Sequence, residues 1–337
     1  MDMQIIAELA QGFEGSPGQA RLLLRAAAAA GADAAKFQLV YADELATPDY
    51  KHYALFRSLE MTDEIWQGLA NYANEQHIAL HLDIFGERSL ALAERIGAQA
   101  LKVHGTDIAN IGLLKSIAAA GVSQVLLGAG GAHLDEIEHA LNILAGKDVV
   151  VLLGFQGYPT PTDANQVARV ATLSRRWAGR ERVRVGFADH ADPKSVLRVA
   201  LAAMALGAGA SVFEKHLTLG EVMKMEDHEA ALNPDSFAEF SAALRDCASA
   251  YGNVGQGSDF GMSASEQGYR QMIRRHVVTR MPMSRGAALQ PEQLSLKRTS
   301  CNYPLTELGR VYGAQLKRPV QANEPLTADD ILLGENA

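Results

Sequence analysis

Residues 4–39, QIIAELAQGFEGSPGQARLLLRAAAAAGADAAKFQL, contain the unit that decides the fold. The apolar run Gln4–Leu9 is typical of a buried strand, Gln19–Ala30 has the pattern of a helix, and Ala34–Leu39 predicts a second strand. Gly31 follows the helix, where glycine tolerates the left-handed conformation that turns the chain toward the next strand. This order predicts two parallel strands with a helix packed on them.

The same unit recurs through about residue 245. The predicted strands are Gln4–Leu9, Ala34–Leu39, Ile78–Leu82, Ala100–Val103, Gln124–Leu127, Val149–Leu153, Val183–Phe187 and Ser211–His216. Helical patterns lie between them, among them Asp63–Gln76, Glu87–Ile96, Ile108–Ala120 and Asp135–Leu144. Eight such units predict the α/β class and a (β/α)8 TIM barrel, whose usual size is ~250 residues. A doubly wound sheet is the alternative, but its glycine fingerprint does not follow the first strand.

Composition narrows the function classes. The 337 residues carry a formal net charge of -8, so no general attraction to nucleic acid or to an anionic membrane is expected. Hydrophobic residues make up 48% of the chain, enough for a sizeable core. Cys247 and Cys301 have no metal-site spacing, and Met1 leads straight into the first strand without a secretory leader. We therefore expect a cytoplasmic globular protein.

The pattern changes after the predicted barrel of residues 1–250. Residues 251–273 contain the turn-rich stretch Gly252–Ser258 and are predicted to form a linker. Residues 274–337 show short strands and turns, which predict a small β-rich domain. About 60 residues form a marginal core, so this domain is expected to pack against something larger, such as a neighbouring subunit.

Two histidines end consecutive predicted strands. His190 follows the seventh strand and His216 ends the eighth, so both would lie at the mouth of the barrel. Two neutral imidazoles with open positions suit a divalent Mn, Fe, Co or Zn ion. The alternative, that they are ordinary hydrogen-bonded histidines, stays open at this point.

Other strand ends add charged and polar groups. Lys36 and Lys102 end the second and fourth strands, where a lysine can neutralise an anion or form a Schiff base. Glu8 is a carboxylate inside an apolar run, which favours a functional or ion-paired role. The loop Gly128–Gly131 offers backbone N–H groups for an anion. Further candidates at the barrel mouth are Gln38, Asp83, His104, Asp107, Gln156, Tyr158, Asp189, Glu214 and Lys215.

Several motifs resemble those of the sialic acid synthase family. They are Ile5–Leu9 with Glu14-Gly15-Ser16, Ala29–Gln38, Tyr158-Pro159-Thr160-Pro161, Gly186–His190, Phe213–Leu219, Asp227-His228, Asn233–Phe237, Lys297-Arg298 and Leu326–Ile331. The likeness covers nearly the whole chain in order. It implies a TIM barrel followed by a small β-rich, antifreeze-like (SAF) domain.

The resemblance also implies an activity. Enzymes of this family use Mn²⁺ or a similar ion and condense phosphoenolpyruvate with the open-chain aldehyde of an N-acetylated amino sugar. It implies that His190 and His216 bind the metal ion, that Glu8, Lys36, Lys102 and Tyr158 are catalytic, and that Gln38, Asp227 and Arg298 contact substrate. Because the family's equivalent of Arg298 reaches into a partner's barrel, it further implies a domain-swapped homodimer. The strand ends add Asp107 as a catalytic candidate and Gln156 as a substrate-binding candidate.

The chain departs from the family pattern around the phosphate of phosphoenolpyruvate. Asp83, Ala129 and Ala188 stand where the family has hydroxyl donors. A charge-assisted hydrogen bond is worth on the order of 1.5–3 kcal/mol, so these losses matter. Two alternatives therefore stay open: a metal-dependent aldolase, lyase or isomerase on a sugar or keto acid, and a catalytically silent sugar-binding paralogue.

Overall fold

The computed structural model describes residues 3–252, 257 and 260–332. The chain divides into two compact units, Met1–Gly252 and Asn253–Ala337. Within the described residues, no helix has the length and apolar character needed to cross a membrane.

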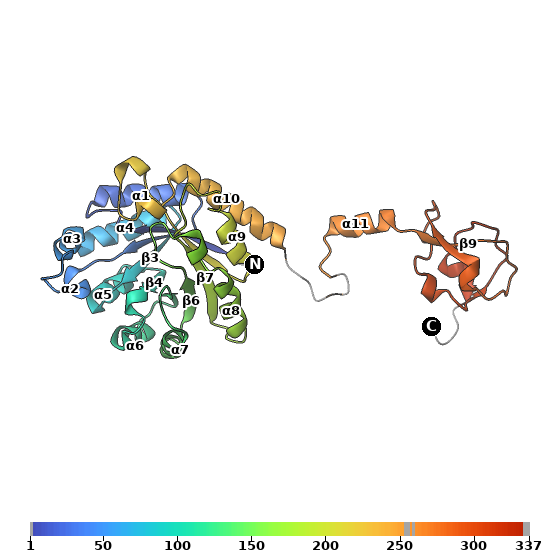
Figure 1. Ribbon diagram of the computed structural model, residues 1–337, viewed down its shortest axis with the longest axis horizontal. Helices are drawn as coiled ribbons and strands as arrows, with labels where there is room; N and C mark the ends of the chain where they lie inside the picture. The colour runs from blue at the N-terminus through green and yellow to red at the C-terminus, as the bar shows by residue number, and fades with distance from the viewer. Residues whose placement is uncertain (1–2, 253–256, 258–259, 333–337) are drawn as a thin grey trace. The chain divides into compact units, whose positions relative to one another are not determined.

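The first unit is a closed barrel of eight parallel strands in sequential order, which confirms the predicted TIM barrel (Figure 1). The last strand pairs with the first, and this pairing closes the barrel. In the register of the pairing, Glu8 lies opposite His216. The strands are β1 Gln4–Ala10, β2 Ala34–Gln38, β3 Ala79–Ile84, β4 Ala100–Val103, β5 Gln124–Gly128, β6 Asp148–Leu153, β7 Val183–Asp189 and β8 Val212–His216.

Helices surround the strands (Figure 1). They are α1 Pro17–Ala29, α2 Ala42–Leu45, α3 Tyr53–Leu59, α4 Asp63–Glu75, α5 Glu87–Arg95, α6 Ile111–Ala119, α7 Leu134–Ile143, α8 Ala168–Arg176, α9 Ala200–Gly207 and α10 Pro234–Tyr251. Short 3-10 helices are η1 Gly105–Asp107, η2 Thr162–Ala164, η3 Glu221–Met223 and η4 His228–Ala230. Helix α1 shows why the sequence starts and stops where it does. The Ser16 hydroxyl accepts the Gln19 N–H at 3.3 Å, and Gly31, with φ +77°, follows the C-cap residue Ala30.

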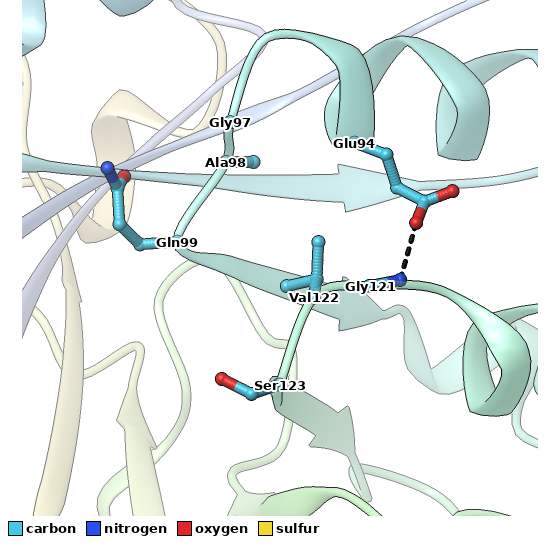
Figure 2. Close-up of a pocket in the computed structure, with 7 residues that line it drawn as sticks. All are labelled: Glu94, Gly97, Ala98, Gln99, Gly121, Val122 and Ser123. Atoms are coloured by element: carbon cyan, nitrogen blue, oxygen red, sulfur yellow. Dashed lines mark hydrogen bonds between the residues drawn. The ribbon is translucent and has the colours of Figure 1, made fainter.

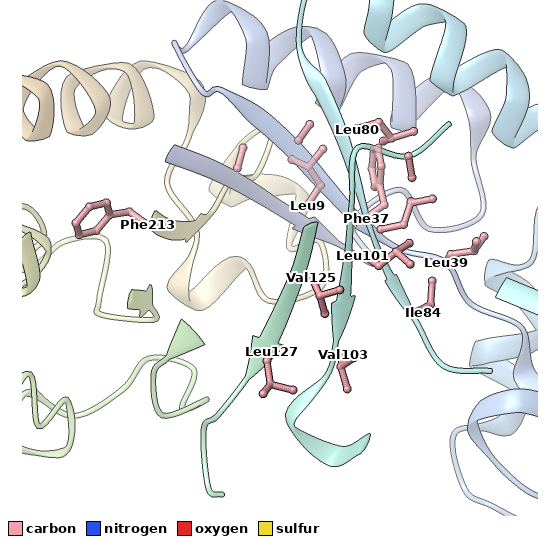
Figure 3. Close-up of a cluster of buried hydrophobic side chains, with 14 of the residues drawn as sticks. Leu9, Phe37, Leu39, Leu80, Ile84, Leu101, Val103, Val125, Leu127 and Phe213 are labelled. Carbon is pink, nitrogen blue, oxygen red and sulfur yellow. The ribbon is translucent and has the colours of Figure 1, made fainter. Parts of the chain in front are cut away.

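Side chains alternate between the two faces of each strand. The outward side chains, such as Phe37, Leu101 and Val125, form the apolar layer between strands and helices (Figure 3). The inward side chains include a second apolar cluster of Ile6, Ala34, Ala100, Leu126, Val150, Leu152, Ala188 and Val212. The next inward positions toward the carboxyl ends of β1 to β4 and β8 are charged or polar. The apolar cluster therefore forms the floor on which the polar groups stand.

The second unit contains a helix and two two-stranded sheets. Its elements are α11 Ala264–Ile273, β9 His276–Thr279, β10 Leu294–Lys297, β11 Gln315–Leu316, β12 Ile331–Leu332 and the 3-10 helices η5 Pro291–Gln293, η6 Leu308–Arg310 and η7 Ala328–Asp330. Ten buried apolar residues form its own small core, among them Val277, Leu316 and Leu326. Helix α11 lies inside the stretch predicted to be a linker, and none of its residues is buried.

Candidate active site

Five charged side chains meet inside the barrel at the carboxyl ends of its strands. They are Glu8, Lys36, Asp83, Lys102 and Glu214, and each is exposed by only 0 to 3%. The strand register explains the meeting, because Glu8 lies opposite Lys36 and Asp83 lies opposite Lys102. Alternation then points all five side chains to the inner face. We call this group the charged cluster.

Lys36 is the centre of the charged cluster. Its ammonium group contacts the Glu8 carboxylate, donates to Asp83 Oδ1 at 2.6 Å and lies 3.5 Å from Glu214 Oε2. Lys102 donates to Glu214 Oε1 at 2.6 Å and lies 3.7 Å from Glu8 Oε2. Within the part of the chain that the structure describes, Asp83 Oδ2 and Glu214 Oε2 accept no hydrogen bond. The cluster thus pairs two cations with three carboxylates, and these two oxygens take part in it through ion pairs at 4.0 and 3.5 Å rather than through hydrogen bonds.

The proton states follow from burial and charge. Burial raises the pKa of Glu8 to about 8; Lys36 opposes this rise, while Glu214 and Asp83 add to it. Burial also acts to raise the pKa of Glu214, but Lys102 and Lys36 outweigh it and hold that pKa well below the usual range. Burial disfavours the Lys36 ammonium, yet the carboxylates of Asp83, Glu214 and Glu8 keep its pKa well above normal. Glu8 is therefore the member that carries a proton most readily near neutral pH.

The two predicted metal-binding histidines lie side by side. The ring centroids of His190 and His216 are 5.1 Å apart, and the ring of Tyr158 lies 5.4 and 5.7 Å from them. Burial lowers the pKa of His190 to about 4 and holds that of His216 well below its usual range. Both imidazoles are thus neutral, which is the form that binds a metal ion.

The two histidines suit a divalent ion that takes only part of its ligands from the protein. His190 Nδ1 lies 3.3 Å from the Ala188 carbonyl, an arrangement in which the ring's other nitrogen can act as a ligand. His216 Nδ1 lies 3.9 Å from Asp227 Oδ2. Among the described residues, no group of three or more His, Cys, Asp or Glu side chains is arranged to hold an ion. The protein would therefore supply two imidazoles, and water or substrate the remaining ligands.

Other predicted site residues occupy the rim of the barrel or lie elsewhere. Gln38 Oε1 accepts from Gln11 Nε2 at 2.7 Å. The Gln156 amide lies 3.1 Å from the His104 ring. Asp107 accepts the Thr106 hydroxyl in its own loop, and no hydrogen bond or ion pair joins it to the charged cluster. Asp227 has its pKa raised to about 7, by burial first and then by Glu226 and Glu229. Arg298 follows β10 in the second unit, where it is exposed.

Asp83 and Glu214 were candidates at the barrel mouth, but their pairing with the two lysines was not predicted. Strand parity was the signal that could have indicated it: Glu214 lies two residues before His216 and so shares its inward face. By the same parity, His81 lies two residues before Asp83 on β3 and also faces inward. Its side chain is exposed by 1%, and burial lowers its pKa to about 3.

The loop expected to offer bare N–H groups is tightly packed. The Ala129 N–H donates to the Leu152 carbonyl at 2.9 Å, so it is not free for an anion. A Cβ at Gly130 would collide with the carbonyl oxygen of Gly154, and one at Gly154 with that of Ala188. The ends of β5, β6 and β7 therefore approach each other through backbone alone.

This packing predicts the effect of Gly154→Ala. We expect it to lower the free energy of unfolding by about 1–3 kcal/mol, because the new methyl group has only backbone and the Ala188 side chain to push against. Gly179→Ala is the matched control, since nothing lies within 4 Å of its Cβ position. Urea denaturation of both variants measures the difference, and equal midpoints would contradict the close approach.

A separate cavity of about 420 Å³ lies at the opposite end of the strands (Figure 2). It is lined by the turns that precede β4 and β5, and Glu94 Oε1 accepts the Gly121 N–H there at 2.5 Å. Its lining residues are Glu94, Gly97, Ala98, Gln99, Gly121, Val122 and Ser123, with no nucleophile beside a base. The catalytic candidates all lie at the carboxyl end instead.

Comparisons with known proteins agree along the whole chain. The model of the NeuB family matches residues 23–256, and that of the SAF domain matches residues 274–332. The N,N'-diacetyllegionaminic acid synthase of Legionella pneumophila is 26% identical over 348 residues, covering 97% of this chain and 94% of the relative. The spore coat polysaccharide biosynthesis protein SpsE of Bacillus subtilis is 25% identical, covering 98% and 94%.

A solved structure matches nearly the full length of the chain. A Chromobacterium violaceum protein assigned as spore coat polysaccharide biosynthesis protein E superposes with a TM-score of 0.81 at 26% identity. The match covers 98% of this chain and 99% of that chain.

Proposed function

Because the chain belongs to the NeuB family, we propose that it condenses phosphoenolpyruvate with an N-acetylated amino sugar to form a nonulosonic acid. Membership confirms the resemblance to sialic acid synthases, and the chain is accordingly a carbon–carbon bond-forming enzyme. The observation that carries the proposal is that the charged cluster and the His190–His216 pair lie at the same end of the barrel, where Glu8 is opposite His216.

The proposed reaction assigns a task to each group. C3 of phosphoenolpyruvate bonds to the aldehyde carbon of the open-chain sugar, water adds at C2, and inorganic phosphate leaves. Lys36 and Lys102 hold the anionic groups of the enol acid, because they are the two cations of the charged cluster. Glu8, with a pKa of about 8, holds or moves the proton at its carboxyl group during these steps.

His190 and His216 would hold a divalent ion, Mn²⁺ by the family resemblance. When bound, such an ion acts as a Lewis acid toward the sugar aldehyde. Tyr158, whose ring contacts both imidazoles edge-on, would lie beside the bound ion and its substrate. Asp227, near His216, is placed to accept a hydrogen bond from the sugar.

One observation favours a second candidate, an aldolase, lyase or isomerase that does not use phosphoenolpyruvate. Asp83 is bonded to Lys36 and adds negative charge where a phosphate would need positive charge. Pyruvate and other simple keto acids have the carboxylate but lack the phosphate, which carries a charge of about −1.5 to −2 at pH 7, so they suit this surrounding better.

The deciding experiment mixes the full chain with phosphoenolpyruvate, Mn²⁺ and a panel of N-acetylated amino sugars. Release of inorganic phosphate that depends on one sugar supports the synthase. Binding of pyruvate without binding of phosphoenolpyruvate in calorimetry would instead support the second candidate.

We also propose a homodimer in which the second unit of one chain docks on the barrel of its partner. Helix α11 exposes Tyr269, Met272 and Ile273 at helical spacing, so none of the described residues of its own unit covers this face. In such a dimer Arg298 would contribute to the partner's site, as the family resemblance implies.

We therefore expect light scattering at micromolar concentration to give about twice the chain mass of 36.1 kDa. A chain that ends at Gly252 should run as a monomer, since it lacks the docking unit. A monomeric full-length protein would rule the dimer out.

A further inference from the structure

We propose that Asp83 is a specificity-determining residue: it acts as an internal counter-ion for Lys36 and selects substrates by their negative charge. The anion in question is the acid of the proposed condensation, so its identity rests on the proposed function. The charge selection itself rests on the charged cluster alone.

The geometry ties Asp83 to the cations that an anion would need. Its side chain is fully buried, Oδ1 accepts from Lys36 Nζ at 2.6 Å, and Oδ2 lies 4.0 Å from Lys102 Nζ. Oδ2 accepts no hydrogen bond within the described residues. Asp83 thus pairs with Lys36 through one carboxylate oxygen, while its other oxygen has no hydrogen bond within that part of the chain. Burial without a hydrogen bond is energetically unfavourable for a carboxylate oxygen.

Three carboxylates already surround Lys36. Those of Glu8, Asp83 and Glu214 lie within 3.5 Å of its ammonium group, and Asp83 accepts a hydrogen bond from it. An incoming carboxylate or phosphate therefore competes with them for the same cation. Asp83 is the one whose removal leaves the Lys102–Glu214 pair and the Glu8–Lys36 contact in place.

The charge count gives the same result. Two ammonium groups face three carboxylates, so whichever proton state Glu8 adopts, Asp83 lowers the charge of the cluster by one unit. At ~5 Å and an effective dielectric constant of about 20, one such unit changes the affinity for a monoanion on the order of 10²-fold. A dianion feels twice the interaction, so Asp83 discriminates against it more strongly.

Sulfate is the probe, because it stays a dianion throughout the working pH range and does not react. Calorimetry on the full chain compares the wild type with Asp83→Asn, which removes the charge and keeps the shape, and with Asp83→Glu, which keeps the charge. Asp189→Asn is the matched control. Asp189 is equally buried and lies 3.3 Å from Lys215, and strand alternation places this pair on the outer face of the barrel.

We expect Asp83→Asn to bind sulfate more than ~10²-fold more tightly than the wild type, and pyruvate with a smaller gain, on the order of 10²-fold. Asp83→Glu and Asp189→Asn should match the wild type, and Lys36→Met added to Asp83→Asn should abolish the gain. Equal sulfate affinity in Asp83→Asn and wild type overturns the proposal. If Asp83→Asn does not fold, the wild type decides: a dissociation constant on the order of millimolar or weaker supports the proposal, and micromolar binding overturns it.

The outcome is separable from that of the proposed function. A gain in sulfate binding without any phosphate release would leave the role of Asp83 standing and the synthase wrong. Phosphate release together with unchanged sulfate binding would do the reverse.

Discussion

The double variant His190→Ala, His216→Ala is expected to lose its divalent metal ion and its condensation activity. The two imidazoles are neutral, buried and 5.1 Å apart between ring centroids, and the described residues offer no alternative group of three ligands. Losing a supporting residue of a metal site already costs 10–100-fold in affinity, so losing both ligands should lower it by at least ~10²-fold.

Metal analysis after dialysis and titration with Mn²⁺ measure this loss without reference to turnover. The control is His52→Ala, His139→Ala, which removes two exposed histidines from the same barrel. The same metal content in the site variant and the control would show that the pair does not bind the ion.

Lys36→Met is expected to destabilise the barrel by about 3–5 kcal/mol. The substitution leaves Glu8, Asp83 and Glu214 buried around a single remaining cation, Lys102, and an uncompensated buried charge is costly. Adding Asp83→Asn to Lys36→Met should recover part of the loss, because it removes one of the unpaired carboxylates.

Urea unfolding followed by circular dichroism gives the free energies for this cycle. Lys147→Met is the matched control, since Lys147 is also buried but, among the residues that the structure describes, donates to the carbonyls of Ala120 and Val122 alone. Its loss should cost about 1–2 kcal/mol. Equal losses for Lys36→Met and Lys147→Met would mean that the three carboxylates add nothing.

The barrel was predictable because each strand carries its own signal. The predicted strand Ala100–Val103 is β4 as the structure has it, and the glycine after α1 takes the positive φ that its position required. Helix α11 was not predicted, although Ser263 and Glu266 have the spacing of a helix N-terminus. The Ser263 hydroxyl accepts the Glu266 N–H at 3.1 Å, and glycine-rich neighbours hid this signal.

The residues that belong to the site were more predictable from the sequence than the ion pairs that these residues form. Strand ends and resemblance placed His190, His216, Glu8 and both lysines in one mouth, and the structure brings them together there. The ion pairs depend on the register between strands, since Lys102 and Glu214 are 112 residues apart in sequence and meet only across the closed barrel. A local pattern cannot contain that distance. The sequence predicted that Lys36 and Lys102 neutralise an anion or form a Schiff base, but not that each is paired with carboxylates of the charged cluster.

The closure of the barrel by β1 and β8 has a consequence for the chain as it is synthesised. Lys36 leaves the ribosome early, but Glu214 follows only after the intervening residues are made, roughly 10–35 seconds later at ~5–20 residues per second. Until then neither lysine has its full set of carboxylates, and both are best solvated in water. A nascent chain that stops before β8 therefore cannot close around its own charges, and its unpaired strand edges expose it to proteases or aggregation.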